Sequence, residues 1–326
     1  MILNFAGDFQ ENIIYTINVT TQISDCVGNF PGNICSARFS IPKPVESSDM
    51  VINEILFDPK DDGADFVEVY NRSSKTICLD EIIIAAVNSS SDPNADTIPE
   101  EKYLLFPADY LVFSADPDKV KEQYFTRNPA GFICMKSMPS FSNDSGRILI
   151  MTCSQLVIDD LSYNKDMHFA LLDNAEGVSL ERINFDYQTN DRSNWHSAAE
   201  TEGFATPAYK NSQYSDFTDS ENEISLSPEV FSPNNDGIDD YLTISYLFDN
   251  PGYIGTIIIF DSKGRTVKNL VNHELLATGG CFTWDGLNGS GQMAGIGIYL
   301  VYVEVFNLKG DVKKYKKPCV LAGKMD

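Results

Sequence analysis

The sequence predicts an all-β protein with several β-sandwich or barrel-like domains in series. Short runs rich in β-branched and aromatic residues recur along the chain, and clusters of Gly, Pro, Asn and Asp separate them. Helical periodicity is weak. At 326 residues, 43% of them hydrophobic, the chain is long enough for two or three domains that each bury a core.

Residues 1–48 hold only two or three strands and end in "IPKPVESS" (41–48), a linker rich in Pro and Ser. Two strands do not form a stable sandwich alone, so we expect the C-terminal fragment of a domain. The opening "MILNFAGDFQ" (1–10) has neither the basic start nor the apolar run of a signal peptide. This opening fits either a cytosolic protein or a piece of a longer exported protein, and the incomplete first domain favours the second.

Residues 49–212 predict a larger β domain with one helix. Runs such as "DFVEVYN" (65–71) have the composition of strands. The best candidate for a helix is "DPDKVKEQYF" (116–125), with Asp116 as its N-cap and Pro117 at its first position. One helix among many strands leaves the all-β prediction unchanged.

Two glutamates of this domain are candidates for buried acids. In "VINEIL" the alternation of a strand places Ile52, Glu54 and Leu56 on one face, and Glu68 similarly shares a face with Phe66. A buried carboxylate is unfavourable unless it is paired or liganded. Each glutamate is then either part of an acid/base pair or metal site, or a structural acceptor that caps backbone N–H groups.

A structural role for these glutamates would also be met by an arginine partner, for which Arg182 is the candidate.

The segment 213–223, "QYSDFTDSENE", predicts a polar, acidic linker to the last domain because it has few apolar residues to bury.

The charge is strongly acidic and unevenly distributed. The chain has 24 Lys and Arg against 47 Asp and Glu, a formal net charge of −23, and residues 224–326 hold only 9 of these basic and 11 of these acidic residues. This balance excludes a nucleic-acid binder and an anionic lipid surface. No apolar run approaches the roughly 20 residues of a spanning helix, so we expect no membrane insertion.

Residues 224–326 predict a compact last domain. "DSKG" (261–264) has the composition of a hairpin turn, and Trp284 in "TWDG" is large enough to fill a small core. The final segment "KGDVKKYKKP" (309–318) contains four lysines beyond its turn. They indicate either a docking surface for a secretion component or a solvated strand edge protected from pairing.

The loop that opens this domain, "FSPNNDGIDDYLTISY" (231–246), is a candidate metal site. Side-chain oxygens of Asn234, Asp236 and Asp240, with the carbonyl of Ile238, could bind calcium around the turn at Gly237. The full EF-hand pattern is absent. The alternative is a turn in which these side chains accept the loop's own backbone N–H groups.

No catalytic pattern accompanies these features. Motifs of the HExxH, GxSxG and P-loop types do not occur, so we expect no enzyme and no cofactor apart from the calcium ion raised above. The seven cysteines form no CxxC pair, and Cys26 and Cys35 flank a turn that a disulfide could close. The others are Cys78, Cys134, Cys153, Cys281 and Cys319.

Five short motifs of the middle domain occur in an order that resembles the lamin tail domain of bacterial surface and secreted proteins. The motifs are "VINEILFDP", "DFVEVYN", "GVSLERI", "NWHSA" and "ATPAYKNS", which together span about residues 49–212. Ala208 stands where the family usually has glycine. The resemblance implies a non-catalytic, immunoglobulin-like β-sandwich, and the strands of residues 1–48 are similar to the end of another such domain.

Four motifs of the last domain resemble the gliding-motility-associated C-terminal domain of Bacteroidetes secreted proteins, and the related domain of the flagellar hook-capping protein. They are "FSPNNDGIDDYLTI", "IIIFDSKGRTVKNL", "FTWDGLNGSGQMAGIGIYLVYVEV" and "KGDVKKYKKPCVLA". The resemblance implies a second immunoglobulin-like sandwich, over about residues 224–326. It would act as the sorting signal of the type IX secretion machinery.

We therefore expect a non-catalytic piece of a secreted or outer-membrane surface protein, made of tandem immunoglobulin-like β-sandwich domains. Its partners would be the secretion machinery and an unidentified surface polysaccharide or protein, with cationic or calcium-bridged partners favoured by the acidic charge. Two alternatives remain open: the accessory tail of an upstream secreted hydrolase or nuclease, and a purely structural spacer of the envelope.

Overall fold

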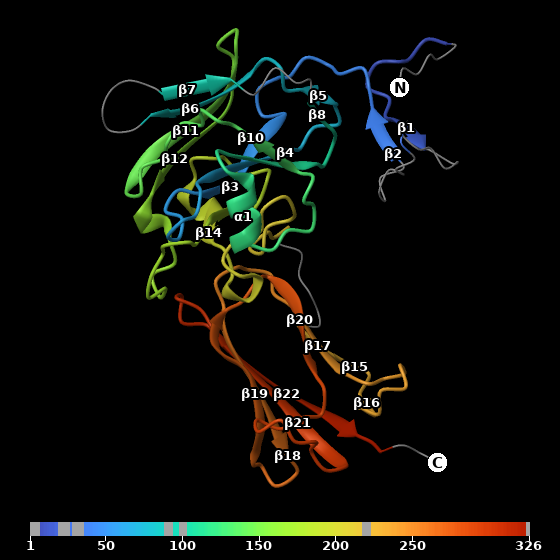
Figure 1. The fold of residues 1–326 in the computed structure, drawn as a ribbon. Coiled ribbons are helices and arrows are strands. Elements are labelled where there is room, and N and C mark those ends of the chain that lie inside the picture. Colours follow the sequence, from blue (N-terminus) through green and yellow to red (C-terminus); the bar gives the residue numbers. More distant parts are fainter. Residues whose placement is uncertain are drawn as a thin grey trace.

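The structure, a computed structural model, has 43% of its residues in strands and 6% in helices, which confirms the prediction of tandem β-sandwich domains. Figure 1 shows a middle domain and a last domain that follow one another end to end. The predicted Cys26–Cys35 disulfide and most of the predicted linker lie outside the described residues. The structure describes residues 7–18, 27, 36–87, 94–97, 103–216 and 223–323.

The N-terminal piece is a two-stranded antiparallel sheet of β1 (Tyr15–Asn18) and β2 (Ser36–Phe39). Its side chains are mostly exposed or half-buried, as expected for two strands that lack the rest of a sandwich. Arg38 forms an ion pair of 2.6 Å with Asp109, so this piece contacts the middle domain.

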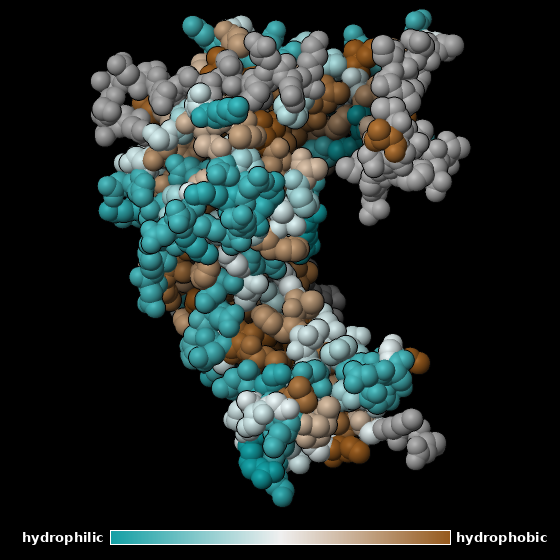
Figure 2. All heavy atoms as spheres, viewed as in Figure 1, coloured by the Kyte–Doolittle hydropathy of each residue, from teal (hydrophilic) through white to brown (hydrophobic). Residues whose placement is uncertain are grey.

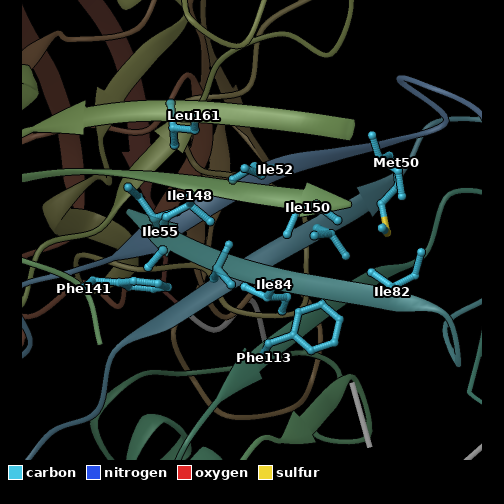
Figure 3. Packing of buried hydrophobic residues seen from close by; sticks show 14 of the residues in the cluster. Met50, Ile52, Ile55, Ile82, Ile84, Phe113, Phe141, Ile148, Ile150 and Leu161 are labelled. Carbon is cyan, nitrogen blue, oxygen red and sulfur yellow. The ribbon is translucent and has the colours of Figure 1, made fainter. Parts of the chain in front are cut away.

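The middle domain packs a six-stranded sheet against a four-stranded one. Figure 3 shows isoleucines from both sheets, including Ile52, Ile84 and Ile148, pointing into the shared core. In order across the sheet, the first has β10 (Phe132–Cys134), β9 (Tyr110–Ser114), β4 (Phe66–Asn71), β3 (Met50–Leu56), β13 (Leu180–Arg182) and β14 (Trp195–Ser197). The second has β12 (Val157–Asn164), β11 (Ser145–Thr152), β6 (Ile82–Val87) and β7 (Asn94–Thr97); β5 (Ile77–Cys78) and β8 (Leu104–Leu105) form a separate pair.

A β-bulge in β3 changes which side chains share a face. Ile52 pairs with Val69 and Glu54 pairs with Glu68, so Asn53 is an extra residue between two paired positions. Ile52 consequently faces the core between the sheets, whereas Glu54 faces the opposite side. The prediction that these two side chains share a face is wrong, because strict alternation does not survive an inserted residue.

The one α-helix of the described chain, α1 (Pro117–Gln123), confirms the predicted cap. The Asp116 side chain accepts the backbone N–H of Lys119, and Pro117 occupies the first turn. Three short 3-10 turns, η1 (Lys165–Met167), η2 (Arg192–Asn194) and η3 (Glu200–Glu202), complete the middle domain. Val120 of α1 packs on the outer face of the six-stranded sheet, where Leu56 and Phe66 lie.

The last domain packs a three-stranded sheet against a five-stranded one, around a fully buried Trp284. The predicted turn at 261–264 joins two antiparallel strands of the larger sheet, as expected. The smaller sheet has β15 (Ile224–Ser227), β17 (Leu242–Leu247) and β20 (Gly279–Trp284). The larger has β16 (Val230–Phe231), β22 (Val312–Leu321), β21 (Gly297–Phe306), β18 (Ile254–Asp261) and β19 (Thr266–Leu275).

The lysine-rich strand β22 is an edge over most of its length. It pairs with β21 throughout, but β16 reaches only Val320 and Leu321. Two of its lysines are paired: Lys313 contacts Glu223, and Lys314 lies 3.2 Å from Glu304. The strand therefore combines an open edge with local charge pairing.

Candidate functional site

Three glutamates lie side by side across neighbouring strands of the six-stranded sheet. Glu54 of β3 pairs in register with Glu68 of β4 on one side and with Glu181 of β13 on the other. All three are completely buried. We call Glu54, Glu68 and Glu181 the glutamate row. Alternation in the sequence predicts the first two as buried acids, but it does not reveal Glu181, because a three-residue strand shows too little alternation to define a face.

The glutamate row is covered by residues 205–215, which we call the strap. The strap donates its backbone N–H groups to the row: Thr206 to Glu54 Oε1 at 2.9 Å and Ala208 to Glu68 Oε2 at 2.5 Å. This is the backbone-capping arrangement named above as the structural alternative. The bulge adds a further donor, because the side-chain amide of the inserted Asn53 donates to Glu68 at 2.6 Å.

Glu181 binds the end of the strap. Its Oε1 accepts the Thr206 hydroxyl at 2.7 Å, and its Oε2 accepts the Ser212 hydroxyl at 2.7 Å and the backbone N–H of Gln213 at 2.8 Å. The side chain of Asn211 also joins the strap to the sheet, donating to the carbonyls of Asn53 and Arg182, each at 2.9 Å. The strap is thus held by hydrogen bonds along most of its length.

Arg182 is not the partner of the glutamates, and that prediction is wrong. Adjacent residues of a strand point to opposite faces, so Arg182 points away from its neighbour Glu181. Its guanidinium lies 3.2 Å from Asp159 and donates to the Thr189 hydroxyl at 2.8 Å. The side chain is buried because these partners satisfy it.

Burial raises the pKa of all three carboxyl groups, and the negative charge of neighbouring row members adds to the effect for two of them. For Glu54, burial and then the charge of Glu181 raise the pKa to about 8. Burial and then the charge of Glu54 raise the pKa of Glu68, and burial raises that of Glu181. No ion pair among the described residues involves the row.

The predicted calcium loop is closed by its own side chains. Asp240 accepts backbone N–H groups from Asn234 and Asn235 at 3.1 and 2.6 Å, and from Gly237 at 2.9 Å. The Asn234 side chain accepts from Asp236 at 2.9 Å, and the Asp236 side chain accepts from the next-but-one residue, Ile238. The geometry has the form of consecutive Asx turns.

Within the described ranges, no group of three or more His, Cys, Asp or Glu side chains is placed to hold a metal ion. Calcium binding through Asn234, Asp236, Asp240 and the carbonyl of Ile238 stays a prediction, since a carboxylate oxygen that accepts one N–H group keeps a further lone pair.

Two histidines lie near the contact between the middle and last domains. His168 is within 2.9 Å of the Ser197 hydroxyl, and His196 packs on Phe169 with ring centres 5.1 Å apart. Burial and then the charge of His196 lower the pKa of His168 to about 4; burial lowers that of His196. Both rings are therefore neutral at neutral pH.

The junction between the two domains has an apolar centre and a polar side. Phe169 of the middle domain packs against Ile254 and Leu275 of the last domain. Figure 2 shows hydrophobic and hydrophilic residues side by side in the region where the two domains meet. A cleft of about 960 Å³ opens beside them, with His196 and Leu308 among its lining residues.

On the polar side, the strap itself contacts the last domain. The Ser212 carbonyl accepts the backbone N–H of Thr278 at 2.9 Å, and the Thr278 hydroxyl donates to the Tyr214 carbonyl at 2.7 Å. The Ser215 hydroxyl donates to the Asp249 carbonyl at 2.7 Å. The first residues of the segment predicted as a linker, 213–215, thus lie in these contacts.

Comparisons with known proteins place the chain in no family. No model of a known protein family matches it, and no curated protein matches it.

None of the helices in the described ranges is both long and apolar enough to cross a membrane.

Solved structures resemble the chain only distantly. PorZ, a bacterial surface component of the type-IX secretion system of Porphyromonas gingivalis, is 11% identical, with 92% of this chain and 32% of PorZ covered and a TM-score of 0.26. Latent PorU of the same organism is 12% identical, with coverages of 80% and 18% and a TM-score of 0.25. FlgD of P. aeruginosa is 17% identical, with coverages of 30% and 69% and a TM-score of 0.22. Scores this low establish neither a common fold nor a common function.

Proposed function

We propose that this chain is a non-catalytic part of a secreted or outer-membrane surface protein. In this proposal the last domain directs export through the type IX secretion machinery, and the middle domain is a structural or binding module. The four motifs of residues 224–326 support the first assignment and the five motifs of residues 49–212 support the second.

The glutamate row supports a non-catalytic middle domain. A general acid or base must reach its substrate to within hydrogen-bonding distance. Glu54, Glu68 and Glu181 are instead fully buried beneath the strap, and their oxygens accept its backbone and hydroxyl groups. The acid/base candidates that the sequence offers are thus used to hold the chain together.

The observation that carries the export assignment is the outer face of the five-stranded sheet. Phe260, Leu300 and Pro318 lie next to one another in register across β18, β21 and β22. They line a shallow depression together with Ile298, which is 61% exposed, and Lys316. An exposed apolar patch with a polar rim is typical of a docking surface for another protein.

For the middle domain we propose a surface polysaccharide or protein as the partner. Most of the acidic excess lies outside residues 224–326, which favours a cationic or calcium-bridged partner over nucleic acid. An accessory tail of an upstream hydrolase or nuclease, and an envelope spacer, remain the alternatives. The full sequence of the parent protein distinguishes them, because a catalytic domain would precede an accessory tail.

The docking face is tested in the parent protein in its source bacterium. Ile298→Glu places a charge in the depression, and Val312→Glu is the matched control, because Val312 is a similarly exposed residue near the opposite end of the same sheet. Protease added to intact cells measures the surface fraction, and the melting temperature of each purified variant measures folding. We expect Ile298→Glu to reduce surface exposure severalfold with unchanged melting; equal surface exposure of both variants would refute the assignment of this face.

A further inference from the structure

The glutamate row and the last domain are joined through the same residues of the strap. Ser212 donates its hydroxyl to Glu181 at 2.7 Å, and its carbonyl accepts the backbone N–H of Thr278 at 2.9 Å. Gln213 donates its backbone N–H to Glu181 at 2.8 Å, and its side-chain amide donates to a carbonyl of the last domain at 3.2 Å. Anything that moves the strap away from the row therefore disturbs the junction.

Two members of the row have the contacts of ionised carboxylates. Both oxygens of Glu68 and one oxygen of Glu181 face N–H groups, which can only donate hydrogen bonds. The other oxygen of Glu181 accepts the only proton of the Thr206 hydroxyl, at 2.7 Å. A proton on any oxygen that faces an N–H group would break that contact, so Glu68 and Oε2 of Glu181 are held as acceptors.

Glu54 differs from its neighbours. Its Oε1 accepts from the backbone of Thr206 and from the Ser179 hydroxyl at 2.5 Å, but its Oε2 lies only near Thr206 Oγ1, at 3.3 Å. That hydroxyl has one proton, and we assign it to Glu181, whose oxygen is closer at 2.7 Å than that of Glu54 at 3.3 Å. With this assignment, the contact to Glu54 is a hydrogen bond when Glu54 is a neutral carboxylic acid that donates from Oε2 to Thr206.

We propose that Glu54 is protonated in the resting protein and that the glutamate row is a pH-sensitive clasp for the junction. When Glu54 loses its proton, its Oε2 and the Oε1 of Glu181 both need the single proton of the Thr206 hydroxyl, so one of them is left without a donor. The buried row also gains a further negative charge. The strap then loosens, and Ser212 and Gln213 release their contacts with the last domain.

Burial raises the pKa of Glu68 and Glu181 as well, but the N–H groups that face their oxygens hold these oxygens as acceptors, which leaves Glu54 as the group that responds. Tyr124 of α1, Tyr110 of β9 and Tyr209 of the strap face the carboxylates, and burial raises the pKa of each phenol far above neutral, so all three stay uncharged. The nearby cations lie over tyrosine rings, Lys60 4.9 Å from Tyr124 and Arg127 5.0 Å from Tyr209. The one further acid near Tyr209 is Glu202 of η3.

The direction of the response follows from the raised pKa of Glu54, about 8 against an ordinary value of 4.5. A carboxyl group whose pKa is raised by folding contributes stability that is complete below the ordinary value and is lost as pH rises through the folded value. The clasp is therefore closed in mildly acidic solution and opens on the alkaline side of neutral.

Glu54→Gln and Glu181→Gln separate this proposal from a merely structural role. Glutamine at position 54 keeps an acceptor for the Thr206 backbone and supplies an N–H donor to its hydroxyl, so it imitates the protonated acid. Glutamine at position 181 places an N–H group against donors. Glu200→Gln, which removes an exposed carboxylate, is the control.

Hydrogen–deuterium exchange of peptides covering residues 205–215 and 276–279 gives the readout, corrected for the intrinsic pH dependence. In the wild type we expect exchange to rise about tenfold between about pH 7 and pH 9, because a group with a pKa of about 8 goes from about one tenth to about nine tenths ionised over this range. Glu54→Gln should show no such rise, Glu181→Gln should exchange faster at every pH, and Glu200→Gln should follow the wild type.

An identical pH profile in the wild type and Glu54→Gln would overturn the proposal. A readout that needs no variant is the infrared spectrum of the wild-type protein. A buried carboxylic acid band that disappears on raising the pH through about 8 supports the clasp, and its absence at neutral pH refutes it.

Discussion

Gly252 of the last domain lies directly against His196 of the middle domain: a Cβ built on the glycine would be 2.8 Å from Nε2 of the ring. The glycine also has a φ of +82°, a conformation that other residues adopt only with strain. The two domains can approach this closely only because position 252 has no side chain. The junction is therefore specified by the sequence of both domains.

Replacing this glycine tests the junction. We predict that Gly252→Ala lowers the free energy of unfolding by about 2 to 3 kcal/mol, because it adds a steric clash to the cost of a positive φ. Gly291→Ala is the matched control, since Gly291 has a φ of +75° with no atom near its Cβ position. Urea unfolding curves of the two variants isolate the clash, and equal destabilisation would show that the contact is unimportant.

The turn at 234–240 predicts a second stability effect. Asp240→Ala leaves three backbone N–H groups without their acceptor, so we expect a loss of about 1 to 3 kcal/mol. Asp236→Ala removes the acceptor of one N–H group and should cost less. Melting each protein in calcium and in EDTA tests the metal prediction at the same time, and a melting temperature that is unchanged in EDTA removes it.

His168 predicts sensitivity to acid. Its pKa falls from an ordinary value of 6.5 to about 4 in the folded protein, so its contribution to stability is complete above 6.5 and is lost as pH falls through about 4. His168→Asn keeps a group able to bond the Ser197 hydroxyl but cannot titrate. We expect it to reduce the loss of stability on acidification by up to about 3 kcal/mol.

The comparison for that variant is His273→Asn, because His273 is exposed on β19. Unfolding free energies measured from about pH 7 to about pH 4 give the slope for each protein. If His168→Asn and the wild type have the same slope, the buried ring is not the acid-sensitive group.

Cysteine labelling separates the core of the last domain from the surface. Cys319 is buried, and burial raises its pKa to about 11, so its reactive thiolate is nearly absent at neutral pH. Cys134, Cys153 and Cys281 are exposed. We predict that iodoacetamide labels the exposed cysteines in the native protein and Cys319 only after the last domain unfolds. Mass spectrometry after timed labelling decides, and rapid native labelling of Cys319 would contradict the packing of β22.

The elements with a strong local signal could be predicted from the sequence. The cap at Asp116 and the turn at 261–264 each depend on residues within a few positions of one another. Local chemistry fixes such features, so composition and spacing are sufficient to find them.

The glutamate row could be predicted only in part. Glu54 and Glu68 follow from alternation, but the bulge at Asn53 and the third member, Glu181, depend on strands far apart in the sequence. The strap lies more than 100 residues beyond Glu54, and its contacts with Thr278 cross a domain boundary. No local pattern encodes such pairings.

The most direct test of the central claim, that the last domain is an export signal on a non-catalytic surface protein, uses the full-length parent with and without residues 224–326 in the source bacterium. Intact cells are treated with protease, and fractionation locates any protected protein. We predict that the intact form is cleaved at the surface and that the shortened form stays inside, folded and protected. If both forms reach the surface equally, the last domain is a binding or assembly module instead.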